Sequence, residues 1–138
     1  MIFNSKSEND TNSLGIKMAK SLGEFRIICL FGEMGTGKTT FTKAFIKSLG
    51  VKSRIISPTY IFVRTYETSF RKIYHIDAYR LDEGDRFDEI KEILDDENAI
   101  IIIEWAEKIK SILPKKRLEL HFESLNENER EIRIKKFF

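Results

Sequence analysis

Residues 26–39 read RIICLFGEMGTGKT, in which an apolar run passes through a glycine-rich turn into a lysine-threonine pair. The run over 26–31 is apolar after its first residue, as is typical of a parallel strand buried on both faces. Beyond the turn, residues 39–49 carry apolar side chains at helical spacing, and Gly50 ends the predicted helix. A strand, a turn and a helix in this order are half of a βαβ unit, so the segment predicts an α/β fold.

The turn itself matches the phosphate-binding loop, in which two glycines five positions apart are followed by Lys and Ser/Thr. Its glycines let successive backbone N–H groups point at phosphate oxygens, and the following helix adds the positive end of its dipole. Lys38 would bring a full charge to the β- and γ-phosphates, and the Thr39 hydroxyl would ligate Mg²⁺. A glycine-rich turn without a ligand is disfavoured by the strand before it and the helix after it. The predicted nucleotide-binding residues of this loop are Gly32, Glu33, Met34, Gly35, Thr36, Gly37, Lys38, Thr39 and Thr40.

Magnesium at such a loop needs a second oxygen ligand, normally a carboxylate at the end of an apolar strand. Asp77 follows the apolar segment 73–76, and Glu104 follows the run 100–103. Ligands of α/β proteins bind at the carboxyl ends of the strands, where both carboxylates are expected. Either could instead mark the exit of its strand into water, and the sequence leaves the division of roles between them open.

The remaining pattern predicts a three-layered P-loop NTPase-like domain over residues 1–138, with a mixed sheet of parallel core strands and antiparallel hairpin additions. Residues 10–22 predict a helix that Asp10 or Thr11 caps, and the acidic segment 85–94 predicts another. The other predicted elements are strands at 61–66 and 72–76 joined as a hairpin through 68–71, a strand at 100–103, a short helix at 105–112, and a final hairpin of 117–122 with 131–135.

Composition excludes several classes of protein. The chain has 138 residues, of which 41% are hydrophobic and 33% charged, an ordinary mixture for one globular domain. The longest apolar run, 99–103, is too short for a membrane span of roughly 20 residues, and the first residues lack the pattern of a signal peptide. Cys29 is the single cysteine, so no internal disulfide or four-cysteine zinc site is expected. These features favour the cytoplasm.

The net charge of +2 conceals an uneven distribution. Residues 1–56 carry nine basic against four acidic side chains, residues 57–100 carry six against eleven, and residues 101–138 carry nine against seven. The positive N-terminal part suits an anionic ligand, but no basic run is dense enough to predict nucleic-acid binding. Within 82–98 alone there are nine carboxylates and two basic residues, Arg86 and Lys91. That stretch is either a solvated helix or a surface that repels phosphate backbones.

Four other side chains have a functional and an ordinary interpretation. His75 could shuttle a proton, although a histidine beside a strand end is more often a structural hydrogen-bond donor. His121 has no obvious partner in the sequence. Trp105 could stack on a base or fill the core, of which core packing is favoured, and Cys29 is expected to be an inert buried thiol.

The loop 32–40, Ser57-Pro58-Thr59-Tyr60, the segment 74–81 (YHIDAYRL) and Ile103-Glu104-Trp105 follow one another in an order and spacing that resemble the TsaE (YjeE) family. The resemblance extends from about Thr11 to the C-terminal hairpin. It implies an ATPase, weak in isolation, that uses ATP and Mg²⁺ and acts with the TsaD and TsaB proteins. Its implied role is the formation of N6-threonylcarbamoyladenosine at position 37 of tRNAs decoding ANN codons, with tRNA met indirectly through the complex.

The resemblance also implies residue roles. Thr39 and Glu104 would hold magnesium, while Lys38 and Asp77 would be catalytic, Asp77 as the carboxylate that positions water. Residues 57–60 would form a switch-like loop near the γ-phosphate. Thr11 and the region of Arg130 would approach the nucleotide.

Two alternatives share the phosphate loop. A small-molecule kinase needs an arginine-rich lid and an acceptor pocket, whereas the only candidate lid here, residues 82–98, is acidic and would repel a phosphorylated acceptor. A non-catalytic module would hold ATP only for structure. A steady-state ATPase assay, alone and with TsaD and TsaB, discriminates among the three.

Overall fold

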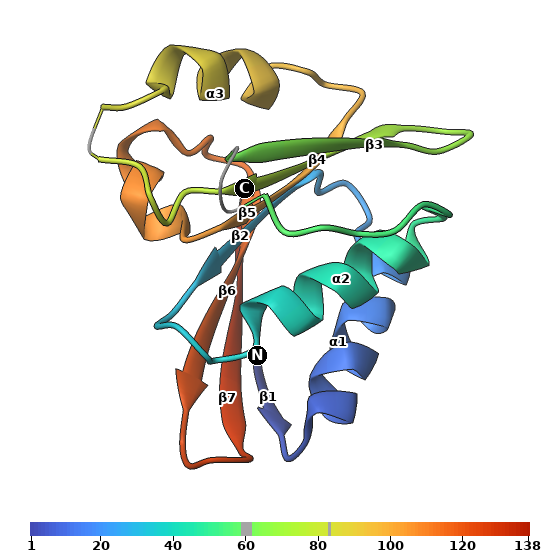
Figure 1. Cartoon of the computed structure of the whole chain (residues 1–138), viewed down its shortest axis with the longest axis vertical. Coiled ribbons are helices and arrows are strands. Elements are labelled where there is room, and N and C mark those ends of the chain that lie inside the picture. The colour runs from blue at the N-terminus through green and yellow to red at the C-terminus, as the bar shows by residue number, and fades with distance from the viewer. Residues whose placement is uncertain (59–61, 83) are drawn as a thin grey trace.

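The computed structural model describes residues 1–58, 62–82 and 84–138. Its strands form one seven-stranded sheet in the order β1-β7-β6-β2-β5-β4-β3 (Figure 1). The strands are β1 (Ile2–Ser5), β2 (Ile27–Phe31), β3 (Val63–Glu67), β4 (Lys72–Asp77), β5 (Ile100–Glu104), β6 (Arg117–Ser124) and β7 (Arg130–Phe137). The helices are α1 (Glu8–Lys20), α2 (Lys38–Ser48), α3 (Phe87–Leu94) and the 3₁₀ helix η1 (Ala106–Ile112).

The centre of the sheet is parallel. β2 pairs with β5 on one side and β6 on the other, and β4 pairs with β5, all in parallel. The β3–β4 and β6–β7 hairpins and the β1–β7 pair add antiparallel strands at the two edges. The predicted mixed sheet with parallel core strands and hairpin additions is therefore confirmed.

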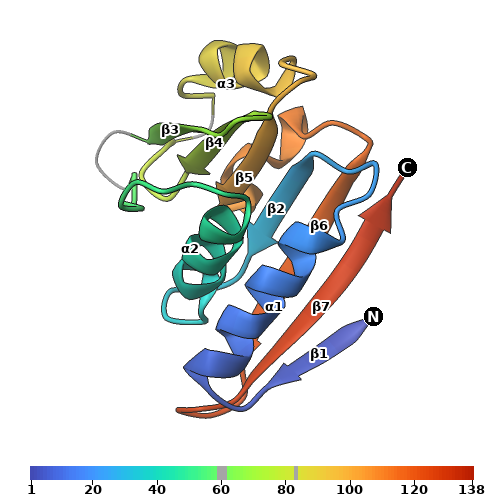
Figure 2. The ribbon, with the colours of Figure 1, turned by 90° about the vertical axis from the view of Figure 1, so that its right-hand side faces the viewer.

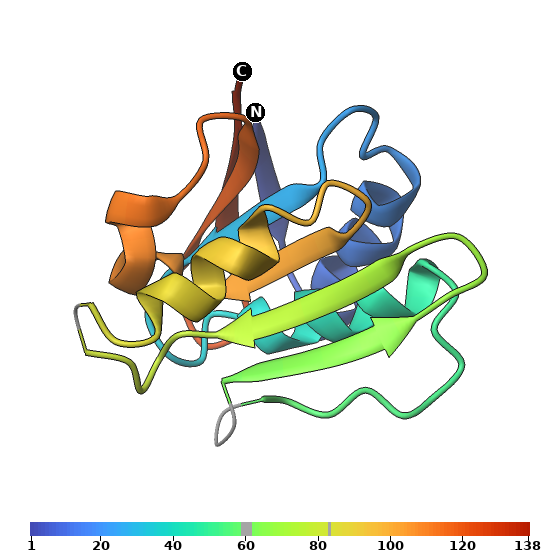
Figure 3. The ribbon, with the colours of Figure 1, turned by 90° about the horizontal axis from the view of Figure 1, so that it is seen from above.

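Helices cover both faces of the sheet, which gives three layers (Figures 2 and 3). One buried cluster joins α1 and α2 to one face through Leu14, Phe41 and Phe45, packed on Ile28 and Ile102. The other joins α3 and η1 to the opposite face, and includes Ile90, Leu94, Ile109, Ile101 and Ile103. The isoleucines of β5 belong alternately to the one cluster and the other, because successive side chains of a strand point to opposite faces.

Helices α1 and α2 cross at Gly15. A Cβ atom at this position would lie 2.7 Å from the carbonyl oxygen of Phe41 and 3.0 Å from the Cβ of Ala44. Because glycine has no side chain, the two backbones can approach closely at this point. This close approach holds α2 against α1.

The first helix begins earlier than the sequence predicts. It spans Glu8–Lys20 instead of 10–22, and its N-cap is Ser7, whose hydroxyl accepts from the Asp10 N–H. The Asp10 carboxylate in turn accepts from the Lys6 N–H at 2.9 Å, so Ser7 and Asp10 cap the helix together. The prediction that Asp10 or Thr11 occupies the N-cap position is wrong, because both residues lie within the helix, where Asp10 supports the cap through its side chain and Thr11 is buried.

Other differences concern short or irregular elements. Strand β1 is not predicted, and the short helix after β5 is a 3₁₀ helix with non-helical backbone at Ile109. Both predicted hairpins are confirmed, the first closed by the Thr68 N–H donating to the Arg71 carbonyl. Of the predicted strand 61–66, Ile61 lies outside the described residues. Within the described ranges no helix is long and apolar enough to cross a membrane.

Strand β6 buries a carboxylate on the face that holds Phe31. Glu119 accepts from Arg117 Nε at 2.7 Å and lies 2.8 Å from His121 Nε2. The His121 ring stacks on Phe31 with 4.4 Å between ring centroids. Burial raises the pKa of Glu119, but the hydrogen bonds from His121 and Arg117 outweigh it and leave the pKa below its usual range. His121 therefore has the partner that the sequence did not reveal.

Candidate functional site

The glycine-rich turn lies between the end of β2 and the start of α2, beside a cavity of about 590 Å³. Gly37 has φ +100° and forms the N-cap of α2, where no side chain caps the helix. The positive end of the helix dipole therefore faces the cavity that Lys38, Thr39 and Thr40 line. Gly32 has φ +142°, and a Cβ there would lie 2.5 Å from the Phe122 carbonyl oxygen. The backbone of this turn thus requires glycine at both positions.

Lys38 is folded back over the loop. Its Nζ donates to the carbonyls of Gly32 and Glu33 and lies 3.7 Å from the ring centroid of Trp105. Burial lowers the pKa of Lys38, while Glu107 and Glu104 oppose this shift. The ammonium group is thus held at the mouth of the loop by carbonyl dipoles and a π face.

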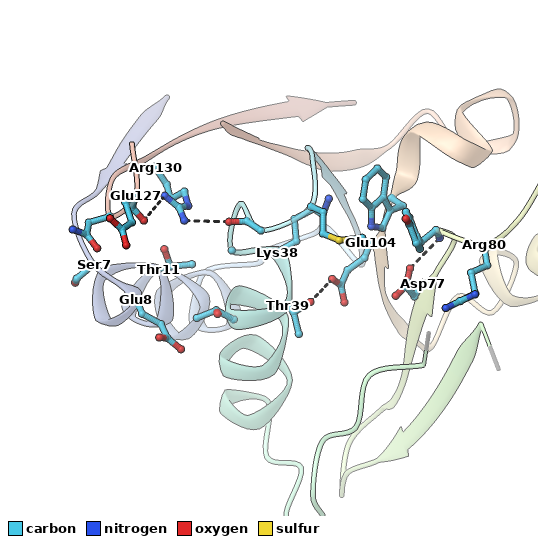
Figure 4. Close-up of a pocket in the computed structure, with 17 residues that line it drawn as sticks. Ser7, Glu8, Thr11, Lys38, Thr39, Asp77, Arg80, Glu104, Glu127 and Arg130 are labelled. Atoms are coloured by element: carbon cyan, nitrogen blue, oxygen red, sulfur yellow. Dashed lines mark hydrogen bonds between the residues drawn. The ribbon is translucent and has the colours of Figure 1, made fainter. Parts of the chain in front are cut away.

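Thr39 and Glu104 meet at the predicted metal position. The Thr39 hydroxyl donates to Glu104 Oε1 at 2.9 Å, and the other oxygen, Oε2, lies 2.6 Å from His75 Nε2. Glu104 is only 2% exposed, although it lines the cavity (Figure 4). A buried carboxylate requires such hydrogen-bond donors, since burying an ion without partners is costly.

The residues present fit magnesium bound jointly with a nucleotide. Within the described ranges no group of three or more His, Cys, Asp or Glu side chains could hold a metal ion. A hydroxyl and one carboxylate supply only two hard oxygen ligands, and Mg²⁺ ordinarily completes its shell with phosphates and waters. This donor set matches a metal that arrives with phosphate groups.

Asp77 stands directly beside Glu104, because β4 and β5 pair in register at these two residues. It is 7% exposed, lines the cavity, and its Oδ1 accepts from the Tyr79 N–H at 3.0 Å. The two candidate carboxylates therefore share one edge of the sheet, as their strand-end positions predict. They differ in that Glu104 contacts Thr39.

Thr11 and Arg130 reach the cavity from opposite ends of the chain (Figure 4). Thr11 is buried against the loop, where a Cβ at Gly37 would lie 3.5 Å from its methyl carbon, and its hydroxyl hydrogen-bonds Ser5. Arg130 donates to the Gly35 carbonyl at 3.1 Å and to the Asn126 carbonyl at 2.8 Å. Both side chains thus support the loop from the side of α1 and the β6–β7 turn, and a contact with nucleotide stays a prediction.

Some predicted residues do not line the cavity. These are Gly32, Glu33 and Thr36, of which Thr36 closes the loop by donating from Oγ1 to the Glu33 carbonyl at 2.7 Å. In the predicted switch-like segment, Ser57 and Pro58 do not line the cavity either. Thr59 and Tyr60 lie outside the described residues.

Several cavity residues were not predicted as binding residues. Trp105 has φ +59°, a rare conformation for a bulky residue. Its ring packs at a tilt against Tyr79, with 4.9 Å between the ring centroids, and also covers Lys38. It therefore belongs to the site as well as to the second core cluster. The others are Ser7, Glu8, Tyr79, Arg80, Glu127 and Asn128. The sequence carried a signal for Tyr79 and Arg80, which lie two and three positions after Asp77. Residues 127 and 128, in contrast, reach the site only because the fold brings the β6–β7 turn there.

The fold and the site together define a P-loop NTPase-like protein. The whole chain superimposes on the crystal structure of YdiB from Bacillus subtilis with a TM-score of 0.82, at 27% sequence identity and over 86% of that chain.

The particular family follows from the sequence comparisons. The model of the family described as "Threonylcarbamoyl adenosine biosynthesis protein TsaE" matches residues 5–132, and the chain belongs to this family. A TsaE protein of Aquifex aeolicus is 40% identical over 94% of this chain and 91% of its own length. One of Borreliella burgdorferi is 40% identical over 86% of this chain and 87% of its own. Both are named tRNA threonylcarbamoyladenosine biosynthesis proteins.

Proposed function

We propose that this chain is a magnesium-dependent ATPase, weak in isolation, that serves as an accessory subunit in tRNA modification. The modification that it supports would be N6-threonylcarbamoyladenosine at position 37 of tRNAs decoding ANN codons. Its partners would be TsaD and TsaB. The observation that carries the ATPase part is the phosphate loop at the N-terminus of α2, with Thr39 hydrogen-bonded to a buried strand-end carboxylate. The pathway rests on the family to which the chain belongs.

The loop would bind the phosphates of ATP through its backbone N–H groups and Lys38. Lys38 would exchange its carbonyl contacts for phosphate oxygens, a gain because a full negative charge attracts an ammonium more strongly than a carbonyl dipole does. Met34, Gly35 and Thr40 would line the nucleotide site, with Thr11 and Arg130 at its rim. Bound magnesium would neutralise charge on the phosphates.

Glu104 and Thr39 would hold the metal, and Asp77 would orient the attacking water. The hydrogen bond between Thr39 and Glu104 favours this division, since the loop threonine and the metal carboxylate must face one point. Asp77 accepts from a backbone N–H within its own turn and lies one strand further than Glu104 from β2, the strand that leads into the phosphate loop. A side chain so placed is suited to hold water beside the phosphates.

A steady-state ATPase assay tests the proposal. The chain is assayed with and without Mg²⁺, alone and with TsaD and TsaB, beside the Lys38→Ala variant. We expect slow Mg²⁺-dependent phosphate release that rises with the partner proteins and is lost in the variant. Phosphate transfer to a small acceptor would indicate a kinase, and nucleotide binding without hydrolysis under all conditions would indicate a structural module.

The remaining parts of the proposal follow from this role. A subunit of a tRNA-modifying assembly works where tRNA is modified, so we place the chain in the cytoplasm. It would act as one nucleotide-binding domain over residues 1–138, without a membrane partner, and would meet tRNA through TsaD and TsaB.

A further inference from the structure

We propose that His75 is a positioning residue that makes Glu104 present a single oxygen to the metal and so favours Mg²⁺ over Ca²⁺. The inference rests on the proposed function, because it concerns how the chain receives a metal-nucleotide complex. His75 lies in the interior of β4, is 1% exposed, and does not line the cavity. Any effect of His75 on the site must therefore pass through Glu104.

The two oxygens of Glu104 are held by different elements. Oε1 accepts from Thr39 at the start of α2, and Oε2 lies 2.6 Å from His75 Nε2 in β4. That second contact has the length of a strong, charge-assisted hydrogen bond. A carboxylate anchored on both oxygens keeps its plane fixed between the helix and the sheet.

The ring of His75 acts as the donor in this contact. Its Nδ1 is buried and has no hydrogen-bond partner in the described part of the chain. A proton on Nδ1 alone would leave a buried N–H unpaired and would set the Nε2 lone pair against a carboxylate oxygen. The proton on Nε2 avoids both costs, so His75 donates to Oε2.

The consequence is that Oε1, the oxygen on the side of Thr39, is the one that faces a metal, because Oε2 is directed at His75. Mg²⁺ demands nearly ideal octahedral geometry, whereas Ca²⁺ accepts bidentate carboxylates and larger coordination numbers. A histidine N–H directed at Oε2 holds the carboxylate plane with that oxygen turned toward β4, which disfavours bidentate binding and thereby suits the smaller ion. The partners of metal-binding carboxylates typically change metal affinity 10- to 100-fold when they are removed.

Nucleotide binding tests the inference without relying on turnover. The affinity for ADP is measured by calorimetry over series of Mg²⁺ and of Ca²⁺, and in EDTA, for the wild type, His75→Leu and His75→Gln. In His75→Leu we expect the Mg²⁺ concentration for half-maximal ADP affinity to rise about tenfold, with a smaller rise for Ca²⁺. His75→Gln carries an N–H donor close to the position of Nε2 and should restore the preference for Mg²⁺. Affinity in EDTA should be the same in all three proteins.

His121→Leu is the matched control, because it breaks the other histidine–carboxylate pair, with Glu119, outside the cavity. It should leave both metal series unchanged. If His75→Leu fails to fold, His75→Asn replaces it, since the shorter amide falls away from Oε2 while Gln does not. Wild-type protein that binds no ADP under any condition would overturn the proposed function. Metal-dependent ADP binding that is identical in the wild type and the His75 variants would overturn this inference alone.

Discussion

Lys38 shows how one side chain is prepared for its ligand. Its ammonium group is held by two loop carbonyls and the Trp105 ring, in surroundings that lower its pKa. These contacts stabilise a cation less well than water does, so a phosphate that replaces them gains more than it would from an exposed lysine. Affinity for nucleotide is therefore concentrated in a residue that adds little to folding.

Replacing Lys38 by alanine is expected to weaken ATP binding at least tenfold, which corresponds to the roughly 1.5–3 kcal/mol of a hydrogen bond to a charged group. The thermal midpoint should change little, because the buried ammonium is poorly solvated. Calorimetry and thermal denaturation measure the two effects. Lys43→Ala is the control, since Lys43 is exposed on the same helix and does not line the site. Normal hydrolysis by Lys38→Ala would refute the phosphate-loop assignment.

Two carboxylate substitutions separate metal binding from catalysis. Glu104→Gln should raise the Mg²⁺ concentration needed for half-maximal ATPase activity, because an amide oxygen is a weaker ligand than a carboxylate for a hard cation. Asp77→Asn should leave nucleotide affinity unchanged and lower the turnover rate. Mg²⁺ titrations of the ATPase rate and ATP binding curves distinguish the two effects. The reverse result would exchange the roles of the two residues.

The residues of the site differ in how far the sequence could predict them. Lys38 and Thr39 belong to a local motif, and Asp77 and Glu104 end apolar strands, so their arrangement follows from the fold class. The sequence offers His75 as a proton shuttle or a structural donor but does not reveal its partner, because Glu104 lies 29 positions away and meets it through strand pairing. The pair of His121 with Glu119 was missed, although residues two apart in a strand share a face.

Among the elements, the crossing of α1 and α2 depends most directly on one residue, Gly15. A valine there would drive its Cβ against the backbone of Phe41, which cannot give way as a flexible side chain can. We expect Gly15→Val to lower the free energy of unfolding by about 1–3 kcal/mol, the usual range for overpacking. Urea denaturation measures it, with exposed Lys17→Ala on the same helix as control. Unchanged stability would mean that the two helices separate at little cost.

Glu119 in strand β6 leads us to expect that the free energy of unfolding depends on pH in the acid range. The pKa of Glu119 is lower in the folded chain than the roughly 4.3 of an unfolded glutamate. The unfolded state therefore binds the proton first, so the stabilisation by Glu119 is complete above that value and is lost as the pH falls through the lowered pKa. In Glu119→Gln, the free energy of unfolding should therefore depend less steeply on pH in this range.

The measurement is urea denaturation of Glu119→Gln from pH 7 to pH 3. Glu123→Gln, an exposed position further along the same strand, serves as the control and should keep the slope of the wild type. An unchanged slope in Glu119→Gln would show that the bonds from Arg117 and His121 do not favour the ionised carboxylate.

At this scale, elements with a strong local pattern could be predicted and weakly marked ones could not. β2 and β5 are continuous apolar runs between turn signals, and α2 follows the glycine loop. β1 has only four residues and finds its partner, β7, at the far end of the chain. The start of α1 was misplaced because three neighbouring residues, Ser7, Asp10 and Thr11, are all good caps, and only the structure shows that Thr11 turns inward.

At the scale of the whole molecule, the excess of acidic residues in the middle of the chain forms an acidic surface. The carboxylates around α3 at positions 82, 85, 88, 89, 92, 95 and 97 are exposed, over the face of the sheet opposite α1 and α2 (Figure 3). Such a surface repels a phosphate backbone. We therefore expect the isolated chain to bind tRNA weakly at near-physiological salt and to associate with TsaD and TsaB in a nucleotide-dependent manner. Binding titrations with each partner measure this.

Neutralising variants assign the effect to the acidic surface. Asp88→Asn with Glu92→Gln should weaken the association with TsaD and TsaB if that surface docks on them, and should leave ATP binding unchanged. Glu123→Gln, exposed on a distant strand, is the control. Tight tRNA binding by the isolated chain, unaffected by TsaD and TsaB, would contradict the expectation.

The pairing of β1 with β7 constrains the order in which the chain can acquire its structure during translation. The Met1 ammonium donates to the Ile134 carbonyl, and the Ile134 N–H donates back to Met1, across 133 positions of sequence. Strand β1 must therefore wait until β7 has been synthesised before it can pair, and the central strand β2 waits similarly for β5 and β6. Native pairings that span so much sequence form slowly, so the nascent chain exposes an unpaired edge for most of its synthesis. A chaperone that shields apolar segments would find its substrate in this interval.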